Sequence, residues 1–313
     1  MCEPRSGGCK DSPGRVNGKV ISMSFINYLV SGLSLGSIYA IIALGYTMVY
    51  GIAKMLNFAH GDVIMVGSYI CFFALTRHGL NPLVGVLAAV IVCTALGITI
   101  EWVAYKPLRD ASSLSVLITA IGVSYFLQNM AQLLWSSNPM VFKSVIPSGS
   151  VNILGLTISN VTLATIAACI VIMIVLTTFI EKTRMGKAMR ALSQDKAAAR
   201  LMGINVNKTI SLTFAIGSAL AAIAGVLLCS AYPTLTPTTG AMPGIKAFTA
   251  AVFGGIGSIP GAFLGGLLLG VIENLAKAYI STQLSDAVVF GVLIIVLLVK
   301  PAGILGKKLG EKV

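Results

Sequence analysis

Charged residues are scarce in this sequence. They make up 10% of its 313 residues, whereas hydrophobic residues make up 56%. A soluble domain normally carries about a quarter of charged residues, so this composition excludes an ordinary soluble protein. Several apolar runs reach the roughly 20 residues that an α-helix needs to cross a bilayer. We therefore predict an all-α fold, a polytopic membrane helical bundle.

Motifs of enzymes, metal sites and nucleotide sites are missing as well. The Gly-Lys pairs at Gly18, Gly186 and Gly306 lack the preceding glycine and the following Ser or Thr of a phosphate-binding loop. The six cysteines show no spacing typical of a metal site and imply no secreted disulfide framework. We expect no catalytic residue, no metal and no cofactor on this chain. Any ATP (with Mg) that it depends on must be bound by another chain.

Acidic residues are few, since 10 of them stand against 22 Lys and Arg, which gives a net charge of +12. Such an excess is also found in nucleic-acid-binding proteins. Here the basic residues collect in loops and at the ends of apolar segments, which is the positive-inside pattern of membrane proteins. We therefore expect membrane lipid, and no nucleic acid, around this chain.

Residues 1–22 differ from everything that follows them. They are polar, basic and rich in Gly and Pro, and they lack the apolar core of a signal peptide. We predict that this leader is disordered. Because Met23 stands immediately before the first apolar run, we hypothesise that Met23 is the native start and that residues 23–313 form the membrane domain.

Nine apolar segments can be read along that domain. The segment 244–258 is short for a full span and is interpreted as a possible half-helix or re-entrant piece, so we predict eight or nine crossings. The segments cover residues 26–51, 58–76, 83–104, 114–135, 161–180, 209–230, 244–258, 260–276 and 286–300.

The Lys and Arg bias also predicts the orientation of the chain. The loop 181–208 and the C-terminus should both be cytoplasmic, which requires 244–258 and 260–276 both to cross. The loop 136–160, whose only charge is Lys143, then lies outside.

The loop 181–208 is the most unusual stretch, because it holds seven of the basic residues between two long apolar segments. Its composition predicts one helix over Ala188–Met202, with Gly203 as a stop. Two interpretations stay open: an amphipathic helix lying on the membrane surface, or a docking helix for a soluble partner. The face expected to be apolar consists of Leu192, Ala199 and Met202.

Residues 54–62 form the densest polar cluster within a membrane-embedded stretch. Ionisable groups at membrane depth usually line a cavity or a pathway. Asn57, His60 and Asp62 are therefore candidates for the translocation path, while a structural turn between two helices and a proton relay remain alternatives. Glu101 and Glu273 lie near segment ends and are interpreted as interfacial, beside Lys106 and Lys277.

Glycines recur at intervals of four in the last third of the chain. Residues four apart share one face of a helix, so such glycines let another helix backbone approach closely. We predict a helix-packing role, with a hinge as the alternative. The glycines concerned are Gly257, Gly261, Gly265, Gly266 and Gly270.

Three of these stretches resemble one known family. The sequences YGIAKMLNFAHGDVIMVGSY (50–69), ALSQDKAAARLMGIN (191–205) and KAFTAAVFGGIGSIPGAFLGGLLLG (246–270) are similar to those of bacterial branched-chain amino acid permeases. The resemblance runs from about Met23 to the C-terminus, and the leader is its one clear departure.

The resemblance implies a multi-pass permease of the bacterial inner membrane. Its implied partners are a sister permease subunit, two cytoplasmic ATP-binding cassette subunits and an extracytoplasmic substrate-binding protein. It further implies an ATPase-coupling loop composed of Gln194, Asp195, Ala197, Ala198, Ala199, Arg200, Leu201, Met202 and Gly203.

The implied function is a permease subunit of an ATP-driven importer for leucine, isoleucine and valine. Permeases for urea, short-chain amides or other amino acids look similar, and the sequence does not separate them. A stand-alone proton-coupled carrier using His60 and Asp62 is the alternative from another class, and a purely structural scaffold is a third. The scarcity of further carboxylates within the apolar segments argues against the carrier.

Overall fold

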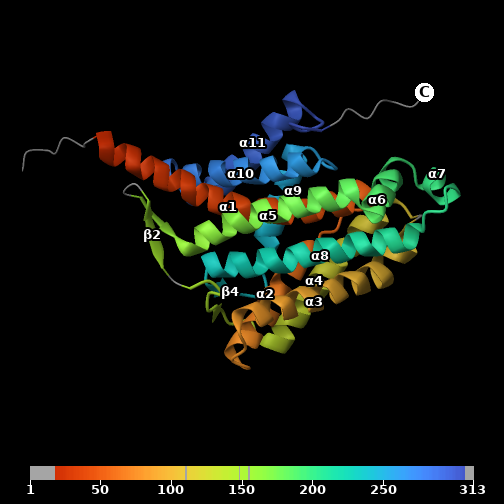
Figure 1. Cartoon of the computed structure of the whole chain (residues 1–313), viewed down its shortest axis with the longest axis horizontal. Helices are drawn as coiled ribbons and strands as arrows, with labels where there is room; N and C mark the ends of the chain where they lie inside the picture. Colours follow the sequence, from red (N-terminus) through yellow and green to blue (C-terminus); the bar gives the residue numbers. More distant parts are fainter. Residues whose placement is uncertain (1–17, 110, 148, 154–155, 307–313) are drawn as a thin grey trace, which may run out of the picture.

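The computed structural model describes residues 18–306, apart from residues 110, 148, 154 and 155 (Figure 1). Helices dominate the described chain, which confirms the predicted all-α membrane bundle. The elements are α1 (Gly18–Ala53), α2 (His60–Thr76), α3 (Pro82–Ile100), the π-helical turn η1 (Glu101–Tyr105), the 3-10 turn η2 (Lys106–Leu108), α4 (Ser113–Trp135), β1 (Met140–Val141), β2 (Ser150–Ile153), β3 (Leu156–Ser159), α5 (Asn160–Lys182), α6 (Arg184–Gln194), α7 (Lys196–Leu201), α8 (Val206–Ala231), β4 (Thr234–Leu235), α9 (Ala241–Gly254), α10 (Ile259–Tyr279) and α11 (Ser285–Val299).

All nine predicted apolar segments are helical. Six helices of the described chain are long and apolar enough to cross a membrane, and α2 and α11 are shorter apolar helices. The ninth segment, α9, has 14 residues and is about 21 Å long, less than the roughly 30 Å of a hydrocarbon core. The six long segments are Phe25–Ala53, Pro82–Leu108, Ser113–Trp135, Asn160–Lys182, Val206–Ala231 and Ile259–Tyr279.

The predicted leader falls mostly outside the described residues. Residues 1–17 lie there, so the predicted disorder and the hypothesis on Met23 keep their status as predictions. The helix α1 begins at Gly18, inside the predicted leader, and residues 18–22 are therefore helical.

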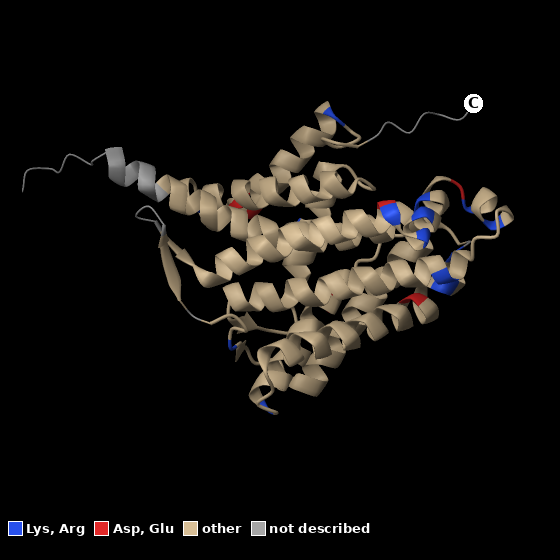
Figure 2. Ribbon diagram, viewed as in Figure 1, with Lys and Arg blue, Asp and Glu red and all other residues tan. Residues whose placement is uncertain are grey.

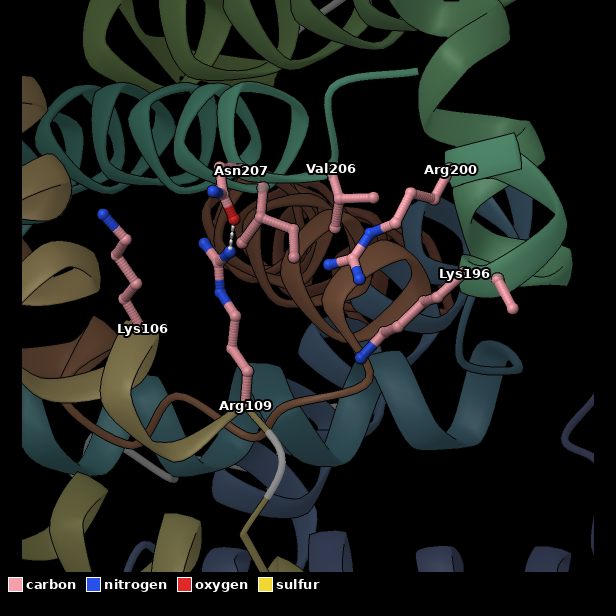
Figure 3. Close-up of a pocket in the computed structure, with 8 residues that line it drawn as sticks. Lys106, Arg109, Lys196, Arg200, Val206 and Asn207 are labelled. Atoms are coloured by element: carbon pink, nitrogen blue, oxygen red, sulfur yellow. Dashed lines mark hydrogen bonds between the residues drawn. The ribbon is translucent and has the colours of Figure 1, made fainter. Parts of the chain in front are cut away.

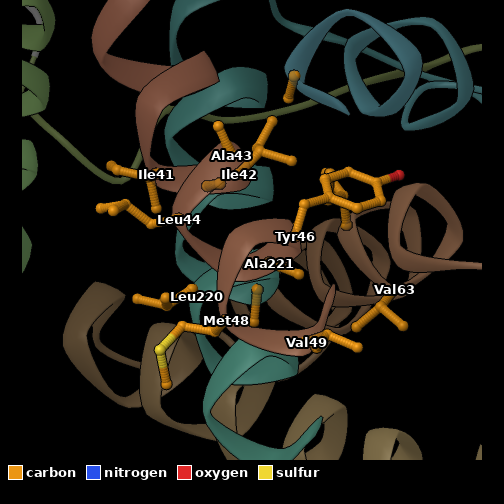
Figure 4. Packing of buried hydrophobic residues seen from close by; sticks show 14 of the residues in the cluster. Ile41, Ile42, Ala43, Leu44, Tyr46, Met48, Val49, Val63, Leu220 and Ala221 are labelled. Atoms are coloured by element: carbon orange, nitrogen blue, oxygen red, sulfur yellow. The ribbon is translucent and has the colours of Figure 1, made fainter. Parts of the chain in front are cut away.

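The helices α1, α2 and α8 form the centre of the bundle. In their most apolar stretches, 72% of α1 and 78% of α8 is buried, against 17% of α4. Small residues bring these helices together, since a Cβ added at Gly225 of α8 would lie 2.4 Å from the Ile64 carbonyl oxygen of α2. Figure 4 shows side chains of this core from α1 (Ile41, Ile42, Ala43, Leu44, Tyr46, Met48, Val49), α2 (Val63) and α8 (Leu220, Ala221).

The glycines of α10 face two neighbouring helices. A Cβ at Gly266 would lie 2.4 Å from Cα of Ala40 in α1, and one at Gly265 would lie 2.3 Å from the Ala250 oxygen of α9. Gly261 likewise faces α9, and Gly270 faces α1. Four of the five predicted glycines thus lie where helix backbones touch.

Gly257 differs from this prediction. It lies in the turn before α10, with a φ of +92°, so it shares no helical face with Gly261. The positive φ, which only glycine adopts readily, explains its presence there. Its backbone lies beside Gly51, near the end of α1.

Two of the apolar helices begin inside the bundle. The helix α1 ends at Ala53, and the chain then returns to His60 at the start of α2. His60 lies beside Gly45, eight residues before the end of α1, about 12 Å along its axis. The helix α9 starts next to this point, because a Cβ at Gly240 would lie 1.8 Å from the Gly61 oxygen.

The crossing between α8 and α10 therefore has two parts. A non-helical segment, 232–240, which holds strand β4 and a turn, enters the bundle, and α9 completes the passage. This geometry agrees with the predicted half-helix at 244–258. It also gives the pair of crossings that places the loop 181–208 and the C-terminal segment at the same end of the bundle.

That end, which carries α6 and α7, is called here the charged end. Figure 2 shows Lys and Arg gathered around it, while the long helices between the two ends carry few charges. Lys54, Arg109 and Lys196 line one hollow there. The C-terminal segment lies against the same end, since the Leu305 amide donates to the Gly254 oxygen at 3.0 Å.

Short strands lie at the opposite end. Strand β1 pairs antiparallel with β4, with Met140 opposite Leu235. Strands β2 and β3 form an antiparallel hairpin, with Ser150 opposite Ser159. Strands β1, β2 and β3 belong to the loop 136–160, which is predicted to lie outside, whereas β4 follows α8.

Candidate functional site

The helix α6 is fixed to the charged end of the bundle. The Thr183 hydroxyl caps it by accepting from the Gly186 amide at 3.0 Å. Gly186 leaves room for α5, because a Cβ there would lie 2.4 Å from Cα of Ile180. Met189 and Leu192 are buried on the inner face of α6. This helix is therefore a packed part of the bundle rather than a floating surface helix.

The single helix predicted over Ala188–Met202 is wrong in one respect, because the structure divides it at Asp195. This residue is extended, with φ −153° and ψ 116°. Its carboxylate accepts from the amides of Ala197 and Ala198 at 2.8 and 3.0 Å. An aspartate at this position caps the next helix and competes with continuation of the preceding one.

The short helix α7 exposes two large apolar side chains at the tip. Leu201 is 88% exposed and Met202 is 83% exposed, whereas Ala199 is buried. The prediction that Met202 shares the buried face is therefore wrong, because α7 ends at Leu201 and Met202 lies at its C-terminal cap. Gly203 follows with a φ of +81°, as expected for a helix stop.

The predicted coupling residues span this break. The exposed apolar tip lies at their C-terminal end, next to the basic side chain of Arg200. In chain order, Gln194 ends α6, Asp195 caps α7, Ala197, Ala198, Ala199, Arg200 and Leu201 lie on α7, and Met202 and Gly203 follow it.

A cationic pocket of about 380 Å³ lies beside α7. Lys106 and Arg109 approach it from the segment after α3, and Lys196 and Arg200 approach it from α7 (Figure 3). The Arg109 guanidinium donates to the Asn207 side chain at the start of α8. This pocket was not predicted, because its basic residues come from two segments that lie far apart in the sequence.

Glu101, interpreted as interfacial, is packed inside the protein at the charged end, with 1% of its surface exposed. It forms an ion pair with Arg109 rather than with Lys106. Its second carboxylate oxygen accepts from the Ser211 hydroxyl of α8 at 2.7 Å. The π-helical turn that begins at Glu101 alters the helix period here, so spacing along α3 alone did not predict these partners.

The Asn57 side chain is held by η1. It is buried, and its Oδ1 accepts from the Tyr105 hydroxyl at 3.0 Å. This bond joins the extended segment after α1 to the end of α3. Its geometry is that of the predicted structural turn.

His60 lies in a tight apolar site at the start of α2. It is 1% exposed, its ring centroid lies 4.6 Å from that of Tyr46, and its Nε2 has no hydrogen-bond partner in the described part of the chain. Gly45 makes room for the ring, since a Cβ there would lie 2.6 Å from Nε2.

Asp62 points to another helix. Its Oδ1 accepts from Gln128 Nε2 of α4 at 2.9 Å, and the side chain is buried. Asn57, His60 and Asp62 are thus neighbours in sequence whose side chains contact η1, α1 and α4 respectively. They do not converge on one point.

Comparison with known proteins agrees with this architecture. Residues 28–297 match the family model described as "Branched-chain amino acid transport system / permease component". The chain belongs to this family. It is 48% identical to the high-affinity branched-chain amino acid transport system permease protein BraD of Pseudomonas aeruginosa, over 92% of this chain and 98% of that protein. It is equally similar, over the same shares, to the corresponding LivH of Salmonella typhimurium, and 46% identical to LivH of Escherichia coli K12.

The permease is thus a multi-pass membrane protein of a transport family. The relatives are matched over nearly their whole length, so the charged end and the half-length helix α9 both lie within the shared region. The cysteines Cys71, Cys93, Cys169 and Cys229 are buried and free.

The permease also contains a buried charge network that the sequence did not indicate. Lys246 of α9 and Glu273 of α10 form an ion pair with Nζ to Oε1 at 2.8 Å. Glu273, interpreted as interfacial, is 0% exposed and is packed among the helices. The neighbour Lys277 contacts it as expected. A lysine within a short apolar segment was the available signal.

Proposed function

We propose that this permease is the membrane subunit of an ATP-driven importer for leucine, isoleucine and valine. The observation that carries the proposal is the similarity, over nearly their whole length, to BraD and LivH, whose names state branched-chain amino acid transport. No phosphate-binding loop occurs in the sequence, so the ATP (with Mg) is hydrolysed by two cytoplasmic ATP-binding cassette subunits. A sister permease completes the membrane part.

The charged end supports docking of these ATPases. The positive-inside rule places this end in the cytoplasm, and with it the C-terminal segment. Leu201 and Met202 are large apolar side chains that project outside the apolar helices, and exposed apolar patches with polar surroundings mark protein interaction sites. Because α6 is packed on α5, a force on the tip would reach the bundle directly.

The opposite end then receives the substrate-binding protein. The strands β1 to β4 and their loops lie at this end, together with the few remaining charges such as Lys143. Selection among solutes begins in the binding protein. Asn57, His60 and Asp62 stay candidates for the translocation path, and their separate contacts favour a structural role that shapes the junction of α1 and α2.

The test is uptake of radiolabelled leucine into proteoliposomes that hold the permease, its sister permease and both ATPases. Binding protein is outside and ATP is inside. Uptake that requires both supports the proposal. Uptake of urea or another solute with leucine inert would retain the importer and exclude the branched-chain substrate. Uptake by this chain alone that an uncoupler abolishes at constant ATP would establish the proton-coupled carrier instead.

The coupling role is tested with the double variant Leu201→Asp/Met202→Asp. We expect normal membrane insertion, loss of ATPase co-purification and loss of uptake. The control for ATPase co-purification is Val141→Asp, because Val141 is similarly exposed but lies at the opposite end. Wild-type co-purification of the ATPases by the tip variant would refute the docking role.

A further inference from the structure

A cavity of about 240 Å³ lies between α1, α8, α9 and α10, toward the end opposite α6 and α7. One wall is apolar and includes Leu35, Leu228 and Met242. Tyr232, which follows α8, is half exposed beside it.

The other wall carries charges of both signs. Lys246 Nζ lies 2.8 Å from Glu273 Oε1 and 2.6 Å from Asp286 Oδ1. Lys277 Nζ lies 2.6 Å from the same Glu273 oxygen. The second oxygen, Oε2, accepts from the Tyr39 hydroxyl at 2.9 Å. Two ammonium groups thus face two carboxylates, and the network as a whole is neutral.

Such a network is a poor device for stability alone. Desolvation of a buried ion pair offsets most of its attraction, and well-packed apolar residues often serve equally well. Ionisable groups among membrane helices typically mark a substrate pathway. Lys246 is only 7% exposed and Glu273 is 0% exposed, yet both line the cavity.

The chemistry of the cavity matches a small zwitterion with an aliphatic side chain. A cavity of this size is below the roughly 300–1,000 Å³ of drug-sized sites. The ammonium group of such a solute can bind a carboxylate of the network, and its carboxylate can bind an ammonium group of the network. Its branched aliphatic chain can pack against the leucine and methionine side chains of the apolar wall. A solute with net charge would leave one member of the network unpaired.

We propose that this cavity is a transient binding site for the substrate amino acid on its way through the permease. The proposal rests on the proposed function. The substrate carboxylate replaces Asp286 on Lys246, and Asp286, which is partly exposed, turns to solvent. The substrate ammonium replaces Lys277 on Glu273, and Lys277, which is also partly exposed, turns to solvent. The substrate side chain lies against Leu35 and Leu228.

This exchange suits a transport site. Each charge that the substrate contacts is already paired, so binding exchanges one partner for another and adds no unpaired charge. Affinity therefore stays low, and a site on a transport path must bind favourably enough to be entered and weakly enough to be left. Strong selection remains with the binding protein.

The decisive variant is Lys246→Met/Glu273→Gln in the complete reconstituted transporter. Removing both partners leaves no buried unpaired charge, so the fold is expected to persist. We expect leucine uptake to fall by about tenfold or more, as when charge contacts to a ligand are lost. ATP hydrolysis stimulated by the binding protein should remain near the wild-type rate. Uptake at the wild-type rate would show that the network is structural and would overturn the proposal.

A second variant keeps every charge and fills the cavity. Leu35→Phe should lower leucine uptake while ATP hydrolysis persists, and its control is Leu133→Phe on the exposed face of α4. Equal uptake by the two Phe variants would count against the proposal. Loss of ATP hydrolysis together with uptake in both cavity variants would also overturn it, since that pattern indicates damaged coupling.

The wild-type transporter separates this inference from the proposed function. Leucine uptake by the wild type, unchanged in the cavity variants, rejects only the cavity site. A wild type that imports urea and not leucine rejects the proposed substrate, and the zwitterion site with it.

Discussion

Gly270 of α10 and Gly36 of α1 meet backbone to backbone. A Cβ added at Gly270 would lie 2.2 Å from Cα of Gly36, a distance that no folded structure tolerates. The two helices can therefore lie this close only while both positions lack side chains. The closest approach of the two helices depends on this pair, as in other membrane proteins with small residues at helix contacts.

The variant Gly270→Leu should therefore destabilise the bundle. Overpacking of this kind costs about 1–3 kcal/mol or more, and we expect a clear loss of thermal stability in detergent. The control is Gly122→Leu on α4, where an added Cβ meets nothing within 4 Å. Similar melting temperatures for the two variants would show that the contact tolerates a side chain.

The break between α6 and α7 depends on the Asp195 cap. Replacing Asp195 by Ala removes both carboxylate bonds to the α7 amides, and loss of an N-cap costs about 1 kcal/mol. We expect faster hydrogen exchange over Ala197–Leu201, measured by mass spectrometry on the purified permease. Asp195→Asn, which keeps a capping oxygen, should retain the slow exchange. Equal rates in the two variants would refute the capping role.

The buried carboxylate at the charged end should be far more sensitive than an exposed one. Glu101→Gln leaves the mostly buried Arg109 guanidinium without its ion pair, a change that costs about 3 kcal/mol in buried pairs. Ser211→Ala removes one bond to this carboxylate and should cost about 1–2 kcal/mol.

The same Glu-to-Gln change at the exposed Glu181 provides the control. Exposed substitutions usually stay within about 0.5 kcal/mol. Chemical denaturation of the three variants in detergent measures their losses of stability. We expect the largest loss for Glu101→Gln and the smallest for Glu181→Gln. A Glu101→Gln variant as stable as Glu181→Gln would show that the pair contributes nothing.

His60 and Gly45 should be energetically coupled. A Cβ at Gly45 would lie 2.6 Å from His60 Nε2, so Gly45→Ala forces the buried ring to move, at about 1–3 kcal/mol. In the double variant Gly45→Ala/His60→Ala the clash is gone. The loss of stability should then be smaller than the sum of the single losses. Additive losses in this double-mutant cycle would contradict direct contact.

Much of the fold was readable from the sequence. The nine apolar segments became nine helices because lipid offers no hydrogen bonds to a free backbone, so a long apolar run in a membrane forms a helix. The basic loops marked one end because charge stays out of the hydrocarbon. Gly266 and Gly270 predicted a close helix contact through their spacing alone.

The candidate site was only partly readable. Gly203 ended α7 as expected, but the helix-forming composition of Ala188–Met202 hid the break at Asp195. That break depends on a few hydrogen bonds. Met202, predicted on the buried face, lies at the exposed C-terminal cap of α7. Asn57, His60 and Asp62 formed a cluster in the sequence but contact three different elements in space.

Sequence alone determined the helices, their order and the end that carries the basic residues, because each follows from the solvent around a short segment. Only the tertiary structure decided which charges meet. Lys246 finds Glu273 at a separation of 27 residues, and Glu101 finds Ser211 at a separation of 110. A buried charge takes the partner that helix packing brings within reach, and that packing is a property of the whole bundle.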